Sequence, residues 1–69
     1  MKKNVFVSKM KLNGDTNEAL AKALGVSPTT MSAKVNEKRG SDFTRTEILT
    51  LVDRWRLTPE EIIDIFFSD

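Results

Sequence analysis

The sequence predicts a single all-α domain, residues 1–69, built as a compact bundle of five short helices. Three observations support this fold class. Apolar residues recur at spacings of three and four in five segments, the period of a helix with one buried face. Serine, threonine or aspartate precedes four of these segments, where a helix N-terminus needs a side-chain acceptor. Short polar stretches containing glycine or proline separate the segments.

The first segment, residues 4–12, is open to two interpretations. The Val-Phe-Val run at residues 5–7 could begin an extended strand, because β-branched and aromatic residues favour strands. Phe6 and Met10 are four residues apart and fit one face of a helix. We favour a helix that ends at Asn13–Gly14, since the two helices that follow need an earlier element to cover their core side.

Residues 15–39 contain two amphipathic helices joined by a break that is centred on glycine. Asp15 is expected to cap the first helix, with Glu18 three residues later completing a capping box. Gly25 suits the left-handed backbone conformation that ends many helices. The first helix of the pair is therefore expected to end at Leu24.

The second helix of the pair is expected to cover residues 28–38. Ser27 can cap it, and Pro28 stands at its first position, where the missing N–H costs nothing. Met31 and Val35 are four residues apart and supply its buried stripe. Two helices joined by so tight a turn predict a helix-turn-helix, a motif whose second helix can enter the major groove of DNA.

Two further helices are predicted from their start signals. Thr44 and Thr58 each precede a glutamate by three residues, which is the spacing of a capping box. One helix is therefore expected at residues 44–56 and the last at residues 58–67. Pro59 occupies the first position of the last helix, where proline is favourable.

The composition argues against several classes of site. The chain has no cysteine and no histidine, so disulfides and the commonest zinc ligands are absent. Glu60, Glu61 and Asp64 are better explained as acids that favour the first turn of a helix than as catalytic carboxylates. We expect no catalytic residue, metal, cofactor or small-molecule ligand. No apolar run approaches the roughly 18 residues that span a membrane, so we expect a cytoplasmic protein.

The charges are unevenly distributed, although the net charge is only +1. Residues 1–45 carry nine lysines and arginines against four acids, whereas residues 46–69 carry two against six. This asymmetry indicates that the N-terminal two-thirds of the chain faces a polyanion. The alternative is an ordinary solvated charged surface.

In the helix-turn-helix interpretation, the N-terminal turns of the second helix face the edges of the bases. The residues expected to contact bases have short side chains: Pro28, Thr29, Ser32 and Ala33. Hydroxyl groups can bond to either type of base pair, and the methyls of threonine and alanine suit contact with thymine methyls. No arginine is placed there for a bidentate contact with guanine, so we expect modest direct readout supplemented by DNA shape. Ordinary capping and solvation of a helix start is the alternative for the serine and threonine cluster.

Contacts to phosphate are expected to position the protein on the duplex. The residues expected to make them are Asn17, Ser27, Thr30, Lys34, Lys38, Arg39, Thr44 and Arg45. For each single lysine or arginine, a solvated surface charge is an equally good explanation. Their grouping on one side of the domain favours the phosphate role.

The stretch NEALAKALGVS at residues 17–27, followed by Thr-Met-Ser at residues 30–32, resembles the phage-repressor and Cro-like helix-turn-helix family, also called XRE-like. Alanine and glycine recur in that family at the places of Ala21 and Gly25. The resemblance covers residues 4–67 and implies a lambda-repressor-like fold. It also implies the base-reading and phosphate-contacting roles given above.

The chain departs from the family pattern at two positions. Asn17 stands where the family commonly has glutamine, and its side chain is one methylene shorter. Glu37 stands where a glycine often closes the recognition helix. We therefore expect this helix to run a turn longer and to end nearer Gly40.

These observations together predict a sequence-specific transcriptional regulator of the repressor or Cro type, such as phages and prophages encode. It would bind a palindromic operator in double-stranded DNA as a homodimer. Ile63, Phe66 and Phe67 cannot all enter so small a core, so they are candidates for the dimer contact; completing the core is the alternative. A second hypothesis is a protein-interaction module that keeps the fold without specific DNA binding, which the low net charge and short recognition side chains favour.

Overall fold

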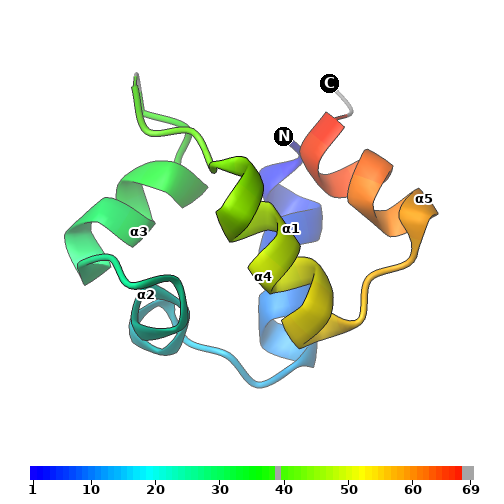
Figure 1. Cartoon of the computed structure of the whole chain (residues 1–69), viewed down its shortest axis with the longest axis horizontal. Coiled ribbons are helices and arrows are strands. Elements are labelled where there is room, and N and C mark those ends of the chain that lie inside the picture. Colours follow the sequence, from blue (N-terminus) through cyan, green and yellow to red (C-terminus); the bar gives the residue numbers. More distant parts are fainter. Residues whose placement is uncertain (39, 68–69) are drawn as a thin grey trace.

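A computed structural model describes residues 1–38 and 40–67 and shows the all-helical architecture in Figure 1. The elements are α1 (Lys3–Leu12), α2 (Asn17–Leu24), α3 (Pro28–Val35), α4 (Arg45–Trp55), α5 (Pro59–Ile62) and a π-helical turn, η1 (Ile63–Phe67). The described residues form a compact body that measures 28 × 25 × 21 Å. The prediction of a compact all-α chain with five helices is confirmed.

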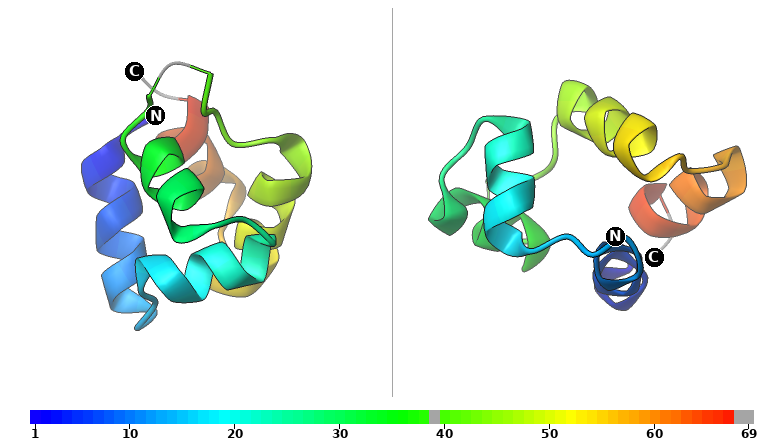
Figure 2. Two further views of the ribbon diagram at one scale, coloured as in Figure 1. Left: turned by 90° about the vertical axis from the view of Figure 1, so that its left-hand side faces the viewer. Right: turned by 90° about the horizontal axis from the view of Figure 1, so that it is seen from below.

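The helices surround one core. Figure 1 and the right-hand view of Figure 2 show α2 and α3 together at one side of the molecule, with α5 and η1 at the other. Helices α1 and α4 lie between these pairs, on opposite sides of the core. The largest fully buried side chains come one each from α1, α2, α3, α4 and η1: Phe6, Leu20, Met31, Leu51 and Ile65. Every helical element except α5 therefore contributes a fully buried side chain to the same apolar interior.

Phe6 is at the centre of an aromatic cluster within this core. Its ring centroid lies 5.2 Å from that of Trp55, 5.3 Å from that of Phe43 and 6.1 Å from that of Phe66. Aromatic pairs at such distances contribute roughly 0.5–1.5 kcal/mol beyond the burial of their area. The first segment is thus a helix with Phe6 on its inner face, and the strand interpretation of residues 5–7 does not apply.

Most helix starts follow the sequence signals. Ser27 accepts a hydrogen bond from the backbone N–H of Thr30 at 3.1 Å, which caps α3. Capping boxes form at the starts of α4 and α5, each between a threonine and the glutamate three residues later. The helices expected at 44–56 and 58–67 begin at Arg45 and Pro59, one residue after the caps Thr44 and Thr58.

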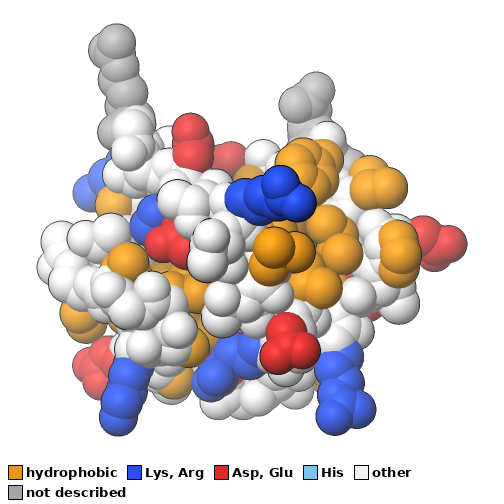
Figure 3. Space-filling view, in the orientation of Figure 1, with side chains coloured by type: hydrophobic (Ala, Val, Ile, Leu, Met, Phe, Trp, Pro, Cys, Tyr) orange, Lys and Arg blue, Asp and Glu red, His pale blue; other side chains and the backbone are white. Residues whose placement is uncertain are grey.

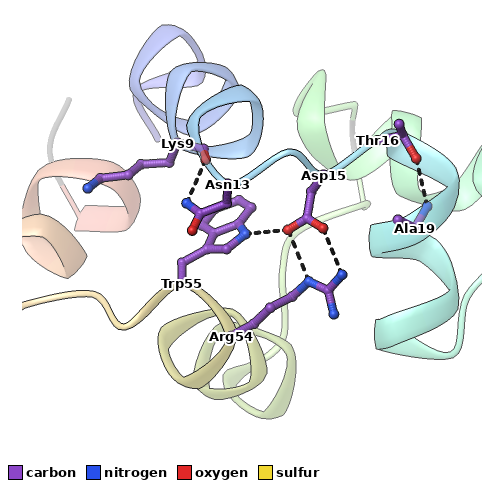
Figure 4. Close-up of polar contacts among 7 residues, drawn as sticks. All are labelled: Lys9, Asn13, Asp15, Thr16, Ala19, Arg54 and Trp55. Carbon is purple, nitrogen blue, oxygen red and sulfur yellow. Dashed lines mark hydrogen bonds and ion pairs between the residues drawn. The ribbon is translucent and has the colours of Figure 1, made fainter.

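The cap expected at Asp15 is wrong. Thr16 caps α2 instead, because its hydroxyl accepts from the backbone N–H of Ala19 at 3.1 Å. Asp15 lies one residue before this cap and turns toward α4, where Arg54 and the indole of Trp55 donate to its carboxylate (Figure 4).

The end expected for α3 is also wrong. The helix stops at Val35, three residues before the predicted end, and Asn36 follows as its C-cap. Glu37 then takes a left-handed conformation, with φ of +53°, and the N–H of Lys38 returns to the carbonyl of Ala33 at 3.0 Å. This is the closure that glycine usually provides. Glutamate makes it here at some cost in backbone energy, because its Cβ crowds the left-handed conformation.

The last predicted helix is continuous but changes its winding. Only Pro59–Ile62 is α-helical, and Ile63–Phe67 is wound as a π-helix, in which hydrogen bonds reach the fifth residue. Phe66 is half-buried in this turn, whereas Ile63 and Phe67 keep 58% and 69% of their surface exposed. The π-helical turn thus sends one phenylalanine to the core and leaves the next at the surface.

Candidate nucleic-acid interface

The exposed face of α3 is the candidate interface. Pro28, Thr29 and Ser32 are exposed and Ala33 is half-buried, while Met31 on the opposite face is fully buried. The left-hand view of Figure 2 looks onto this side of the molecule, where α3 and α2 lie at the front. The four residues expected to contact bases therefore lie on the accessible part of α3.

The starts of α2 and α3 are joined through Asn17. Its side-chain Nδ2 donates to the backbone carbonyl of Pro28 at 3.0 Å. Gly25, with φ of +71°, and the bond from the N–H of Val26 to the carbonyl of Ala21 at 2.9 Å fix the turn between the two helices. The helix pair is consequently held as one unit, with both N-terminal ends close together.

Several of the polar side chains on this face already have partners. The hydroxyl of Ser27 donates to Oγ1 of Thr30 at 3.0 Å in addition to its capping role. Ser32 Oγ accepts from Nδ2 of Asn36 at 3.3 Å. The hydroxyl of Thr29, by contrast, makes no hydrogen bond to any other described residue. Thr29 is therefore the hydroxyl-bearing residue of α3 that is most available to a ligand.

Lys34 is buried, whereas a contact with phosphate requires an exposed side chain. Its side chain is 10% exposed, and Nζ lies 2.9 Å from both the backbone carbonyl of Asp42 and Oε1 of Glu47. The same ammonium stands 5.9 Å from the centroid of the Phe43 ring. The ammonium is thus engaged inside the fold, where it fastens α3 to the start of α4. The ammonium is not available to the backbone of a duplex, so Lys34 is no longer a candidate for contact with phosphate.

The Lys34 contact also affects the acid that it meets. Burial raises the pKa of Glu47, but hydrogen bonds from the backbone of Thr44 and from the Lys34 ammonium outweigh burial and hold that pKa below its ordinary value. Glu47 is therefore a carboxylate at neutral pH. It serves the capping box and the ion pair with the same oxygen, Oε1.

Most of the other expected phosphate contacts fall into two groups. Thr44, like Ser27, uses its hydroxyl in a helix cap, and the Thr30 hydroxyl accepts from that of Ser27, so all three would meet phosphate at a helix N-terminus. Lys38 and Arg45 are exposed cations after α3 and at the start of α4. Arg39 lies outside the described residues.

The three residues expected to form a dimer contact are divided by the structure. The ring of Phe66 packs against Phe6 and Phe43 in the core. Ile63 and Phe67 remain exposed. Figure 3 shows the hydrophobic side chains gathered over α4 and α5. An apolar groove there is lined by Arg45, Ile48, Leu49, Ile62 and Phe67, and we call it the α4–η1 groove.

Sequence reasoning missed a polar cluster around Asp15, shown in Figure 4. Asp15 Oδ2 accepts from Nε1 of Trp55 at 2.6 Å and from Nε of Arg54 at 3.0 Å, and Oδ1 accepts from Nη2 of Arg54 at 2.7 Å. The Arg54 guanidinium is the main cause that holds the pKa of Asp15 below its ordinary value. The partners are about forty residues apart in the chain, so no local pattern indicates them.

No family model, curated protein or solved structure matches this chain. The helix-turn-helix interpretation therefore depends on its own residues and geometry. Within residues 1–38 and 40–67, no helix combines the length and the apolar character needed to cross a bilayer. The same residues contain no cluster of three or more acidic side chains that could hold a metal ion.

Proposed function

We propose that this protein is a sequence-specific regulator that binds double-stranded DNA with α3 in the major groove. One observation carries the proposal. The first two turns of α3 present Pro28, Thr29, Ser32 and Ala33 on an accessible face, while the opposite face is fixed to the core by Met31. Short side chains allow a helix to approach the floor of the groove closely, which is how the second helix of a helix-turn-helix is used.

The surroundings of α3 support contact with phosphate. The N-terminal ends of α2 and α4 expose backbone N–H groups, which favour anions. Asn17 lies at the first of these ends, and the exposed Arg45 lies at the second. Lys38 follows α3 at the surface. These groups would position the protein without reading sequence.

A second copy of the chain is the proposed occupant of the α4–η1 groove. A single short helix buries little area in DNA, and two-fold pairing doubles the contacts on a palindromic site. The exposed apolar side chains Leu49, Ile63 and Phe67, with 56%, 58% and 69% of their surface accessible, supply the contact surface. Phe66 belongs to the core and is not part of this contact.

The alternative is a protein-interaction module that has this fold without specific DNA binding. The α4–η1 groove and the net charge of only +1 favour it. A DNA-binding protein loses affinity steeply with added salt, because each phosphate contact releases counterions. An interaction module would not bind DNA specifically, so it would show no such dependence of DNA affinity on salt.

The test is selection of bound duplexes from a random pool at physiological salt, followed by a salt titration of the enriched sequence. We expect an enriched palindrome, at least a thousandfold preference over bulk DNA, and a logarithmic salt slope that corresponds to several phosphates. Equal weak affinity for all duplexes, or no binding at low salt, would refute DNA regulation. Binding of a non-palindromic site by a protein that sediments as a monomer would refute the dimer alone.

A further inference from the structure

The exposed face of α3 lacks long polar side chains. The helix contains two residues with long side chains, Met31 and Lys34, and both are buried. The side chains most often used for bidentate contacts with bases are those of arginine, lysine, asparagine and glutamine. Because Lys34 is turned toward Glu47, none of these projects from α3. Reading of base edges by paired hydrogen bonds is therefore not available to this helix.

The nearest amide, at Asn36, is also engaged. Its Nδ2 donates to the backbone carbonyl of Ser32 at 2.9 Å, and its Oδ1 accepts from the ammonium of Lys3. Both ends of the amide thus have partners inside the protein. An adenine would have to displace these partners before Asn36 could read it.

Methyl groups remain as the specific feature of the face. Thr29 and Ala33 are four residues apart on α3, so their methyls lie on the same side and about 6 Å apart along the helix axis. Two base steps of a duplex cover about 7 Å. Pro28, at the start of the same face, adds an apolar ring. In the major groove, the matching apolar feature of a base is the methyl at C5 of thymine.

We propose that α3 selects duplexes by the C5-methyl groups of pyrimidines, that is, thymine or 5-methylcytosine. This inference rests on the proposed function, since it specifies what the same helix recognises. Thr29 is the main specificity-determining residue, because it is exposed and carries both a methyl and a hydroxyl that has no partner among the described residues. Ala33 supplies the second methyl.

The experiment begins with the enriched duplex from the selection and replaces each thymine in turn by deoxyuridine, which lacks only the C5-methyl. We expect about a fourfold loss of affinity at each contacted thymine, the effect of one buried methyl, and no change elsewhere. In a second arm, a contacted T·A pair is replaced by C·G with and without a C5-methyl on cytosine. Methylation is expected to raise affinity about fourfold. Insensitivity to the methyl in either arm overturns the proposal.

Two matched variants assign the effect to Thr29. Thr29→Ser removes the methyl and keeps the hydroxyl, so discrimination between thymine and deoxyuridine should disappear at one position. Thr29→Val keeps the methyl and removes the hydroxyl, so discrimination should persist. The reverse result would show that the methyl of Thr29 does not meet the methyl of the base, and it would overturn the proposal. The failures are distinguishable: no enriched duplex refutes DNA regulation itself, whereas an enriched duplex without methyl sensitivity refutes only this inference.

Discussion

The two ends of α4 fasten the α2–α3 unit by ion pairs of opposite sense. At the start of α4, the acid Glu47 belongs to the helix and the cation Lys34 comes from α3. At its end, the cation Arg54 belongs to the helix and the acid Asp15 comes from the segment before α2. Helix α4 is therefore the element against which both helices of the unit are positioned.

The two ion pairs differ in how deeply their members are buried. Both members of the Lys34–Glu47 pair are nearly buried, with side chains 10% and 12% exposed. In the other pair, Asp15 is 9% exposed and Arg54 is 38% exposed. Removing a partner from a buried pair leaves an uncompensated charge in the protein, whereas a partly solvated partner is replaced by water. The start of α4 should therefore be the more sensitive end.

The largest effect is expected for Lys34→Met, which keeps an apolar stem and removes the ammonium. We expect the free energy of unfolding to fall by about 3 kcal/mol, because the carboxylate of Glu47 loses its buried partner. Urea denaturation measures this change. Lys38→Met is the matched control, since Lys38 is exposed, and should change stability by less than about 0.5 kcal/mol. Equal effects of the two variants would contradict the assignment of Lys34 to the interior.

The same two variants separate positioning from phosphate contact in the proposed DNA complex. Lys38→Met should reduce the logarithmic salt slope by about one, since it removes a candidate phosphate contact. Lys34→Met should weaken binding at temperatures where it is folded, yet leave the slope unchanged. A reduced salt slope for Lys34→Met would show that Lys34 does contact phosphate.

A smaller effect is expected at the other end of α4. Asp15→Ala should cost about 2 kcal/mol in the free energy of unfolding, because Trp55 Nε1 and Arg54 both lose their acceptor. Arg54→Ala should cost less than about 1 kcal/mol, because Asp15 retains the indole donor and the partly solvated guanidinium can be replaced by water. Thermal or urea unfolding of both variants would reveal this inequality, and its reversal would show that the exposed cation dominates.

Acid should weaken both ends of α4 together. The Arg54 guanidinium lowers the pKa of Asp15, and the hydrogen bonds from Thr44 and Lys34, acting against burial, lower the pKa of Glu47. A depressed pKa in the folded state means that the unfolded state binds more protons as the pH falls. The stability from these groups is therefore complete above about pH 5 and is lost as the pH falls through about 4 and below. Urea denaturation from pH 7 to pH 3 measures the loss, and Asp15→Asn should make it shallower.

The smallest effect is expected at the C-cap of α4. Arg56 has a left-handed backbone conformation, with φ of +51°, which glycine adopts without steric cost. Arg56→Gly should therefore raise the free energy of unfolding by up to about 1 kcal/mol. Arg45→Gly, within the first turn of the same helix, should lower it by about 1 kcal/mol instead. Thermal unfolding that moves both variants in the same direction would contradict this account.

The features that could be predicted from the sequence depend on residues that lie within four positions of one another. The caps at Ser27, Thr44 and Thr58 and the turn at Gly25 were all predictable, because each depends on a side chain or backbone angle next to the helix end. The helical period likewise placed Met31 inward. Local signals of this kind define the helices and the exposed face of α3.

The features that were missed depend on partners distant in the chain. The sequence suggests that Asp15 is a helix cap, but its carboxylate accepts a hydrogen bond from Arg54, 39 residues later. The sequence suggests that Lys34 is a surface cation, but the fold pairs it with Glu47 in the interior. The early end of α3 at Val35 was missed because Glu37, just beyond it, takes a left-handed conformation that glutamate rarely adopts. These positions acquire their roles only in the assembled tertiary structure.

The beginning and the end of the described chain share a backbone hydrogen bond, from the N–H of Lys2 to the carbonyl of Ile65 at 2.9 Å. An ion pair between Lys9 and Glu61 joins the same two helical segments further along. Regions linked in this way open as one cooperative unit when a native protein fluctuates. The amide hydrogens of α1 and of α5–η1 should therefore exchange with solvent deuterium at a common rate. Loosening the π-helical turn would also release the helix that carries Phe6, although almost the whole sequence separates them.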